Sequence, residues 1–192
     1  MWPLLGCSLV SLTITIERSL YWMRQKWAFS TARIDRILEL TDTGEYTAAG
    51  AVDGVGRDAV SGALAAGLKH RQHGLSEAMQ VEAGRRIDSM KQGLAVLDTI
   101  VTMAPLLGIL GTVLGIITSF DLLGASGIED PKAVTGGIAQ ALLTTAAGLT
   151  VAIVTLIPLN YFVSRTQRET RRLEQIATQF EVAYRRSCSN GV

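Results

Sequence analysis

Two apolar stretches of the sequence carry hydroxyl and amide side chains that could act on a proton or an ion. They are Thr112 and Ser119 in the first stretch, and Gln140, Thr144 and Thr145 in the second. Such groups exchange hydrogen bonds with water or with a titrating group, but they do not carry a proton at neutral pH. We predict that these five side chains line a pore in an oligomer. No Asp, Glu, Lys, Arg or His occurs in 99–120 or 133–164, so if the pore conducts protons, a partner protein must supply the titrating group.

Small residues accompany these hydroxyls. An α-helix turns by about 100° per residue. On that basis, one face of the first stretch carries Gly108, Thr112, Gly115 and Ser119. One face of the second stretch carries Gly137, Ala141, Thr144, Gly148 and Thr155, with Thr145 at its edge. Gly111 and Gly115 also form a G-x-x-x-G pair. Small residues let helix backbones approach closely, and threonine hydroxyls bond across the contact. We therefore predict that Gly108, Gly111, Gly115, Gly137 and Gly148 pack helices, and packing alone is the alternative explanation of the threonines.

The composition excludes several classes of protein. Charged residues make up 18% of the 192 residues, against roughly 25% in a typical soluble domain. With 48% hydrophobic residues the chain is not disordered, and its net charge of +1 argues against nucleic-acid binding. We find no nucleotide-binding glycine loop and no helical His pair for zinc, so we predict neither an enzyme nor a bound cofactor. His70 and His73 near Glu77 are more typical of a surface than of a metal site.

The segments that lack charged residues are long enough to cross a membrane. A helix needs about 20 mainly apolar residues to span the hydrocarbon core, and 100–120 and 136–160 meet this length. The first segment is weaker, because it completes a span only by continuing through Glu17 and Arg18. The sequence predicts an all-α membrane protein with three transmembrane helices, a long second helix that extends into the cytoplasm, and assembly into a ring-forming oligomer.

The positions of Lys and Arg predict the orientation. All but one of the 18 basic residues lie in 18–91 or 165–186, and the exception is Lys132. The positive-inside rule places these two regions in the cytoplasm and the N-terminus outside. The predicted segments are a first transmembrane helix (1–22), a cytoplasmic helical region (23–98), a second transmembrane helix (99–120), a periplasmic loop (121–134), a third transmembrane helix (135–163), and a cytoplasmic C-terminal helix and tail (164–192).

The cytoplasmic segments read as helical. Apolar residues at spacings of three and four run from Ser76 into the second span, and no breaker is apparent before Pro105. We predict one long helix over about 76–120, with Ser76 as a plausible N-cap. The tail, 164–186, is expected to continue the third span and to pack against the long helix. These segments are judged too short and too interrupted by glycine to build a separate core.

The N-terminus is expected to be a retained anchor helix. Leu4-Leu5-Gly6-Cys7 looks superficially like a lipoprotein cleavage box, but too few residues precede Cys7 for a signal peptide. A secretory signal would need a basic region ahead of the apolar run. Cys7 and Cys188 lie far apart, one in the membrane and one in a reducing compartment, so no disulfide is expected.

Two sequence runs carry a family resemblance. Residues 104–115 (APLLGILGTVLG) and 137–149 (GIAQALLTTAAGL) resemble the two signatures of the MotA/TolQ/ExbB proton-channel family. Asn160-Tyr161-Phe162 matches the usual ending of the family's third span. Trp2-Pro3-Leu4-Leu5, with Glu17-Arg18, is similar to the first span of ExbB-like members, which the chain resembles most.

The resemblance implies a pentamer of three-span subunits in the bacterial inner membrane. The ring would enclose an ExbD- or TolR-like single-span partner whose membrane Asp takes up the proton. Proton flow would turn the partner, and the motion would pass to a TonB- or TolA-like protein that crosses the periplasm. By matching motifs, Thr112 and Thr145 correspond to the family's pore threonines and would hydrogen-bond that carboxyl group.

The sequence departs from the family pattern at two positions, and several alternative functions stay open. Many ExbB and TolQ members carry Glu where this chain has Gln140, and the proline of their third span is displaced here to Pro158. TonB-type uptake and Tol-type envelope maintenance both fit these residues, and the family favours protons over sodium ions. A MotA-type stator would need a fourth span and a larger cytoplasmic domain. A non-conducting membrane scaffold is the main alternative function.

Overall fold

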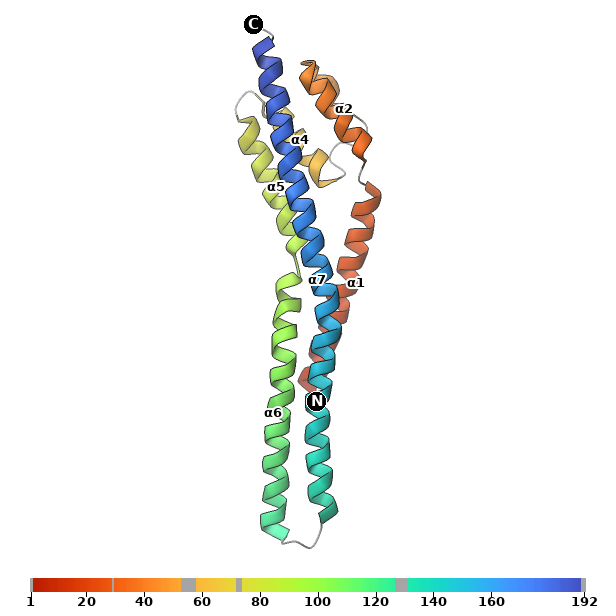
Figure 1. Cartoon of the computed structure of the whole chain (residues 1–192), viewed down its shortest axis with the longest axis vertical. Helices are drawn as coiled ribbons and strands as arrows, with labels where there is room; N and C mark the ends of the chain where they lie inside the picture. The colour runs from red at the N-terminus through yellow and green to blue at the C-terminus, as the bar shows by residue number, and fades with distance from the viewer. Residues whose placement is uncertain (1, 29, 53–57, 72–73, 127–130, 191–192) are drawn as a thin grey trace. The chain divides into compact units, whose positions relative to one another are not determined.

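The computed structural model describes residues 2–28, 30–52, 58–71, 74–126 and 131–190, and every regular element within these ranges is an α-helix (Figure 1). The helices are α1 (Trp2–Ala28), α2 (Thr31–Asp42), α3 (Tyr46–Gly50), α4 (Ala59–Lys69), α5 (Leu75–Lys91), α6 (Leu94–Ser126) and α7 (Pro131–Asn190). They belong to two compact units. The apolar unit comprises Met1–Ser19 and Gly93–Phe162, and the polar unit comprises Leu20–Gln92 and Val163–Val192. The predicted all-α class is confirmed.

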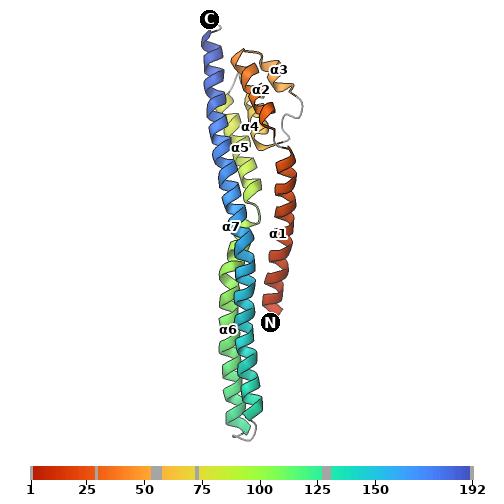
Figure 2. The same cartoon turned by 45° about the vertical axis from the view of Figure 1, so that its right-hand side comes forward.

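In the apolar unit, α6 and the first half of α7 run side by side (Figures 1 and 2). The described residues contain two helical stretches long and apolar enough to cross a membrane, within Leu75–Leu122 and Val134–Cys188. They cover the second and third predicted spans. The helix α1 is not apolar enough to count as a third such stretch, because Glu17 and Arg18 interrupt its apolar run. The first span therefore stays a prediction.

The first part of α1 packs within the apolar unit. Leu4 lies in a buried cluster with Ile100, Ala104 and Ala152. Further along α1, the buried hydroxyls of Ser11 and Thr155 are hydrogen-bonded at 2.7 Å. These contacts attach α1 to both α6 and α7.

The prediction of one unbroken helix over about 76–120 is wrong at Gly93. α5 ends at Lys91 and α6 begins at Leu94. Gly93 has φ +78, in the left-handed region that glycine adopts at little cost. Apolar spacing alone misses this interruption, because Met90 and Leu94 keep the helical interval across it. The two helices are therefore separate elements, and Pro105 lies inside the second of them.

We expect Gly93→Ala to lower the free energy of unfolding by about 1–2 kcal/mol, the cost of a left-handed alanine. The new Cβ would also lie 3.0 Å from Ile14 Cγ2. Thermal unfolding followed by circular dichroism in detergent micelles measures the loss. Gly84→Ala is the matched control, because its Cβ meets nothing within 4 Å in the middle of α5. That control should gain up to about 1 kcal/mol from helix propensity; equal behaviour of the two variants would contradict the interruption.

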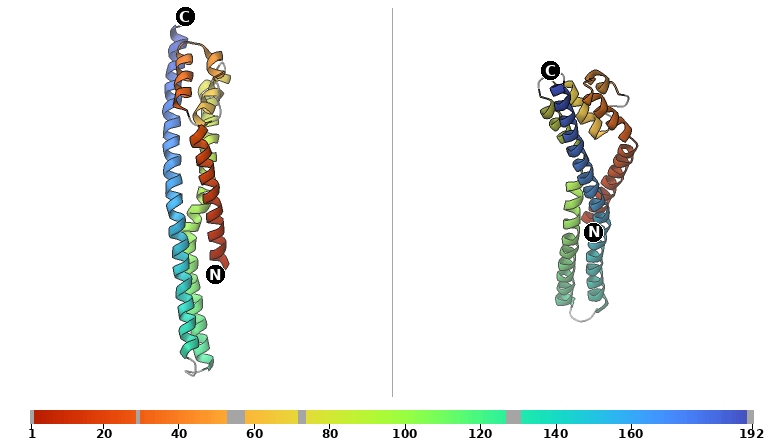
Figure 3. Two further views of the ribbon diagram at one scale, coloured as in Figure 1. Left: turned by 90° about the vertical axis from the view of Figure 1, so that its right-hand side faces the viewer. Right: turned by 45° about the horizontal axis from the view of Figure 1, so that its top comes forward.

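The polar unit has a core of its own. The helices α2, α4 and α5 and the C-terminal half of α7 belong to this unit (Figure 3). Their most deeply buried large side chains are each at most 2% exposed: Ile37, Leu64, Met79, Met90 and Phe180. The prediction that these segments cannot build a separate core is therefore wrong. The glycines that suggested interruption instead allow close contact, because a Cβ on Gly67 would lie 2.5 Å from Met79 Cγ.

A buried aspartate holds the start of α4. Asp58 is the N-cap, and its carboxylate accepts hydrogen bonds from the Ser61 backbone N–H at 2.9 Å and hydroxyl at 2.8 Å. The same carboxylate pairs with Arg33 of α2 at 3.0 Å, and the Asp58 side chain is 2% exposed. One residue therefore caps α4 and ties it to α2.

We expect Asp58→Ala to destabilise the protein by about 2–4 kcal/mol, because it removes a cap and breaks the buried ion pair with Arg33. Denaturant unfolding of the full chain in micelles measures the change. Glu39→Gln is the control. It breaks the Arg36–Glu39 pair, whose side chains are 57% and 65% exposed, and should cost less than about 1 kcal/mol. Similar losses for the two variants would show that Asp58 is not a structural anchor.

Two further expectations concern α5 and the tail. Ser76 is not the N-cap: Gly74 holds that position, and the Ser76 hydroxyl donates to Glu181 Oε1 of α7 at 2.5 Å. The tail does continue the third span, because α7 runs unbroken from Pro131 to Asn190. Near its end, the Tyr184 hydroxyl donates to the Arg71 carbonyl at 3.2 Å. Burial raises the pKa of the Tyr184 phenol, and the neighbouring Cys188 adds to the effect.

Candidate functional site

The helices α6 and α7 meet backbone to backbone at Gly108 and Gly148. A Cβ on Gly148 would lie 2.5 Å from the Ala104 carbonyl oxygen and 3.1 Å from Gly108 Cα. A Cβ on Gly108 would lie 3.0 Å from Thr145 Cα. Real Cβ atoms do not lie 2.5 Å from a backbone oxygen, so the approach of the two helices requires glycine at position 148, and at position 108 a Cβ would be tight against backbone atoms.

The other three candidate packing glycines also face the opposite helix. Gly111 faces the Thr144 side chain, Gly115 faces Ala141, and Gly137 faces Ser119. The contact therefore continues along α6 and α7 toward the ends joined through 127–130, which lie outside the described residues. It brings hydroxyl-bearing residues of the two helices within reach of each other.

Thr112 and Thr145 form a hydroxyl pair across the two helices. Their hydroxyls converge on one backbone oxygen: Thr145 Oγ1 lies 3.0 Å and Thr112 Oγ1 lies 3.1 Å from the Gly108 carbonyl. Both residues are half-buried. Because each hydroxyl has one proton and two lone pairs, a pair bonded in this way keeps lone pairs free for another group. The Thr112–Thr145 pair can therefore accept a hydrogen bond from water or from a protonated carboxyl group.

The remaining candidate pore residues line an open groove of about 520 Å³, and one of them, Thr144, also lies 3.3 Å from the Gly108 carbonyl that the pair shares. The groove is lined by Gly111, Gly115, Thr118, Ser119, Leu122, Gly137, Gln140, Ala141 and Thr144. Gln140 is exposed at the groove, whereas Thr144 is buried and donates to the Ala141 carbonyl of its own helix at 2.7 Å. Ser119 is 2% exposed and donates to Gly115 at 2.9 Å. Gln140 and Ser119 thus belong to the groove alone, whereas Thr144 joins the groove to the Thr112–Thr145 pair.

Thr155 bonds to a helix that the sequence pattern did not suggest. It shares a predicted face with Gly148 and Thr144, but its hydroxyl is paired with Ser11 of α1 rather than with α6. Ser11 is absent from the candidate residues. Its signal was present in the sequence, because Ser8, Ser11 and Thr15 recur at helical spacing along α1.

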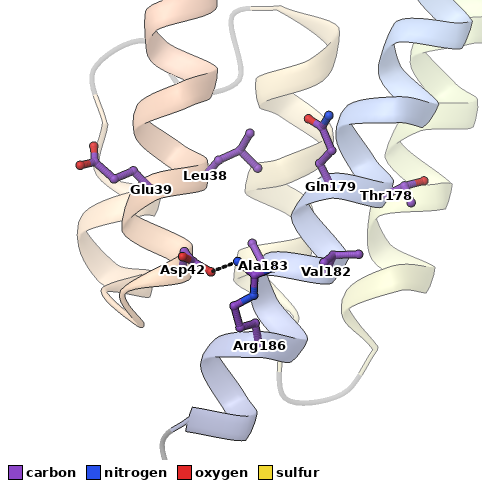
Figure 4. Close-up of a pocket in the computed structure, with 8 residues that line it drawn as sticks. All are labelled: Leu38, Glu39, Asp42, Thr178, Gln179, Val182, Ala183 and Arg186. Carbon is purple, nitrogen blue, oxygen red and sulfur yellow. Dashed lines mark ion pairs between the residues drawn. The ribbon is translucent and has the colours of Figure 1, made fainter.

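The polar unit contains a separate groove of about 490 Å³ between α2 and the end of α7 (Figure 4). Its lining residues are Leu38, Glu39, Asp42, Thr178, Gln179, Val182, Ala183 and Arg186. An exposed ion pair joins Asp42 and Arg186 at 3.8 Å.

The histidines do not form a metal centre within the part of the chain that the structure describes. His70 is exposed at the C-cap of α4, and His73 lies outside the described residues. Across those residues there is no group of three or more His, Cys, Asp or Glu side chains that could hold a metal. At the α6–α7 contact, the polar groups are the hydroxyls, the Gln140 amide and backbone carbonyls.

Comparison with known proteins identifies the family of this chain. The family model of the MotA/TolQ/ExbB proton channel family matches residues 56–175. The chain is 34% identical to the biopolymer transport protein "ExbB-like 1" of Synechocystis sp. over 193 residues, which cover 96% of this chain and 75% of the relative. It is 30% identical to "ExbB-like 3" of the same organism, with 96% and 90% covered. It is 34% identical to the Tol-Pal system protein TolQ of Pseudomonas aeruginosa, with 59% and 49% covered.

These matches cover both sequence runs that carry the resemblance. The family and the two apolar helices indicate a membrane protein with a proton-channel-type role in biopolymer transport. The chain belongs to the MotA/TolQ/ExbB proton channel family and is similar to its ExbB-type members.

Proposed function

We propose that this chain is a proton-channel stator subunit of the bacterial inner membrane. With an ExbD/TolR-like single-span partner, it converts the proton motive force into mechanical work on a TonB/TolA-like protein. The work serves outer-membrane transport or envelope maintenance. The relatives support this proposal by their names, which are those of biopolymer transport proteins and of a Tol-Pal system protein.

The observation that carries the proposal is a hydroxyl pair in a helical contact that lacks any charged side chain. Thr112 and Thr145 share the Gly108 carbonyl and keep lone pairs free. No Asp, Glu, Lys, Arg or His occurs in 99–120 or 133–164. The pair can therefore assist a titrating carboxyl group but cannot replace it. A partner helix that places an Asp beside this pair completes the proton site.

The partner helix is enclosed by a homo-oligomer, which we propose to be a pentamer. Large apolar side chains are exposed along both helices of the contact, among them Leu106, Val113, Leu142 and Ile153. Lipid or neighbouring copies must cover them. One charge that crosses about 100 mV releases about 2.3 kcal/mol, so each cycle of work uses several protons.

The orientation proposed for this subunit places the N-terminus in the periplasm and the C-terminus in the cytoplasm. The distribution of Lys and Arg supports it, because the link at 121–134 carries only Lys132. The first of three spans is then α1, whose contacts with α6 and α7 belong to the apolar unit.

The experiment is reconstitution in proteoliposomes with the single-span protein that co-purifies with this chain. We expect an imposed proton gradient to drive dye-detected proton influx that requires both proteins and the partner's membrane Asp. A gradient of sodium without protons should drive none. The partner's Asp→Asn variant is the control, because it keeps the helix but loses the titrating group.

The competing function is a non-conducting scaffold that only packs helices. The glycine contacts of α6 and α7 support it, since small residues alone suffice for close packing. A scaffold would give a stable complex, no proton influx, and activity in cells that survives a protonophore. That combination of results would exclude the stator role.

A further inference from the structure

A pocket between α1 and α7 in the apolar unit is lined by hydroxyls from both helices. Its volume is about 190 Å³. The hydroxyl-bearing residues are Ser8, Ser11 and Thr15 from α1, and Thr150 and Thr155 from α7. At its centre the buried hydroxyls of Ser11 and Thr155 are bonded to each other at 2.7 Å. None of these residues belongs to the Thr112–Thr145 pair or to the Gln140 groove.

Beside this pocket, α7 lacks one of its backbone hydrogen bonds. Pro158 lies inside α7 and has no N–H to offer the carbonyl four residues earlier, which is that of Val154. Both Val154 and Pro158 line the pocket. In a membrane, an unsatisfied carbonyl costs several kcal/mol, and neighbouring hydroxyls or ordered water must satisfy it.

The polar groups beside the pocket indicate which molecule would occupy it. A hydrocarbon chain cannot donate a hydrogen bond to the carbonyl. An ion would find no opposite charge, because the nine lining residues include no Asp, Glu, Lys or Arg. Water donates and accepts hydrogen bonds, and the hydroxyls of the lining, which lie among mainly apolar surface, give it polar partners. At roughly 30 Å³ per molecule, a space of this size holds several waters.

We propose that the α1–α7 pocket is a hydrated site within the membrane-embedded part of this protein, in which water bridges the hydroxyls and the Val154 carbonyl. It is a second polar site, separate from the threonine pair. It does not depend on proton conduction, so its test is independent of the proposed function.

The test measures the reaction of introduced cysteines with N-ethylmaleimide, which attacks the thiolate and therefore requires water at the thiol. The background is Cys7→Ala with Cys188→Ser, in the full chain in native membranes. Ser8→Cys is compared with its neighbour Leu9→Cys, and Thr150→Cys with Ile153→Cys. Leu9 and Ile153 are 68% and 60% exposed on apolar surfaces and do not line the pocket.

We expect Ser8→Cys and Thr150→Cys to react at least tenfold faster than their neighbours. Ser8→Cys exchanges a single atom, so it reports on the native fold even if the larger change at Thr150 disturbs it. Equal rates within each pair would overturn the proposal. Adding Pro158→Ala restores the N–H for Val154, so the rate at Thr150→Cys should fall several-fold while the Ile153→Cys rate stays constant. An unchanged rate at Thr150→Cys would overturn the role of the freed carbonyl.

Discussion

Thr145→Val is expected to reduce proton influx through the reconstituted complex by about tenfold or more. Valine keeps the shape of threonine but removes the hydroxyl that lies 3.0 Å from the Gly108 carbonyl and contacts Thr112. Loss of a hydrogen bond to a buried polar or charged group costs about 1–3 kcal/mol. If this cost falls on the state in which the partner's Asp gains or loses its proton, it appears directly in the rate. The measurement is dye-detected influx at equal amounts of assembled complex.

Two comparisons separate this effect from a loss of packing. Thr145→Ser keeps the hydroxyl and should retain most of the influx. Thr102→Val removes an exposed hydroxyl of α6 that bonds only to its own helix, and should leave influx unchanged. Thr112→Val should resemble Thr145→Val, because both hydroxyls serve one site. Full influx in both valine variants would refute the role of the threonine pair.

Gly148→Ala is expected to lower the free energy of unfolding by about 1–3 kcal/mol, the usual cost of an added group in a tightly packed contact. Its Cβ would lie 2.5 Å from the Ala104 carbonyl oxygen, a backbone atom that cannot move aside alone. To relieve this contact α6 and α7 must separate, which would also part the Thr112–Thr145 pair. The readouts are Tm in micelles and proton influx.

Gly136→Ala is the matched control on the same helix. Nothing lies within 4 Å of its added Cβ, so it should be neutral or stabilising by up to about 1 kcal/mol through helix propensity. Its influx should be normal. A Gly148→Ala variant as stable as Gly136→Ala would show that the two helices do not approach as closely as the backbone distances indicate.

The sequence predicted the helical contact better than it predicted the arrangement of polar groups around it. Helical periodicity grouped Gly108 with Thr112 and Gly137 with Thr144, and the structure places these residues at the α6–α7 contact. Helical periodicity predicts which residues lie near a contact, but it does not predict on which side of the contact each one lies. Gln140 and Thr145 both border the contact, but Gln140 lines the groove and Thr145 does not.

Backbone conformation explains two of the errors. The break at Gly93 depends on one left-handed residue, and the apolar spacing on either side continues as if the helix were whole. Ser76 has the residue type of a cap, yet α5 starts before it and its hydroxyl bonds to Glu181. A single backbone angle decided where the helix breaks, and a side chain distant in sequence decided what Ser76 binds. The pattern of neighbouring residues shows neither.

The sequence by itself determined what the chain can be made of: helices, two uncharged apolar stretches, and hydroxyls without a proton carrier. Charge and hydropathy are sums over neighbouring residues, so they can be read from a linear chain. Only the tertiary structure decided that Thr112 and Thr145 meet over the Gly108 carbonyl, and that Ser11 pairs with Thr155. It also decided that glycines such as Gly67 build the core of the polar unit. These outcomes depend on which backbones come within a few ångströms of each other, and residues far apart in the chain set that distance.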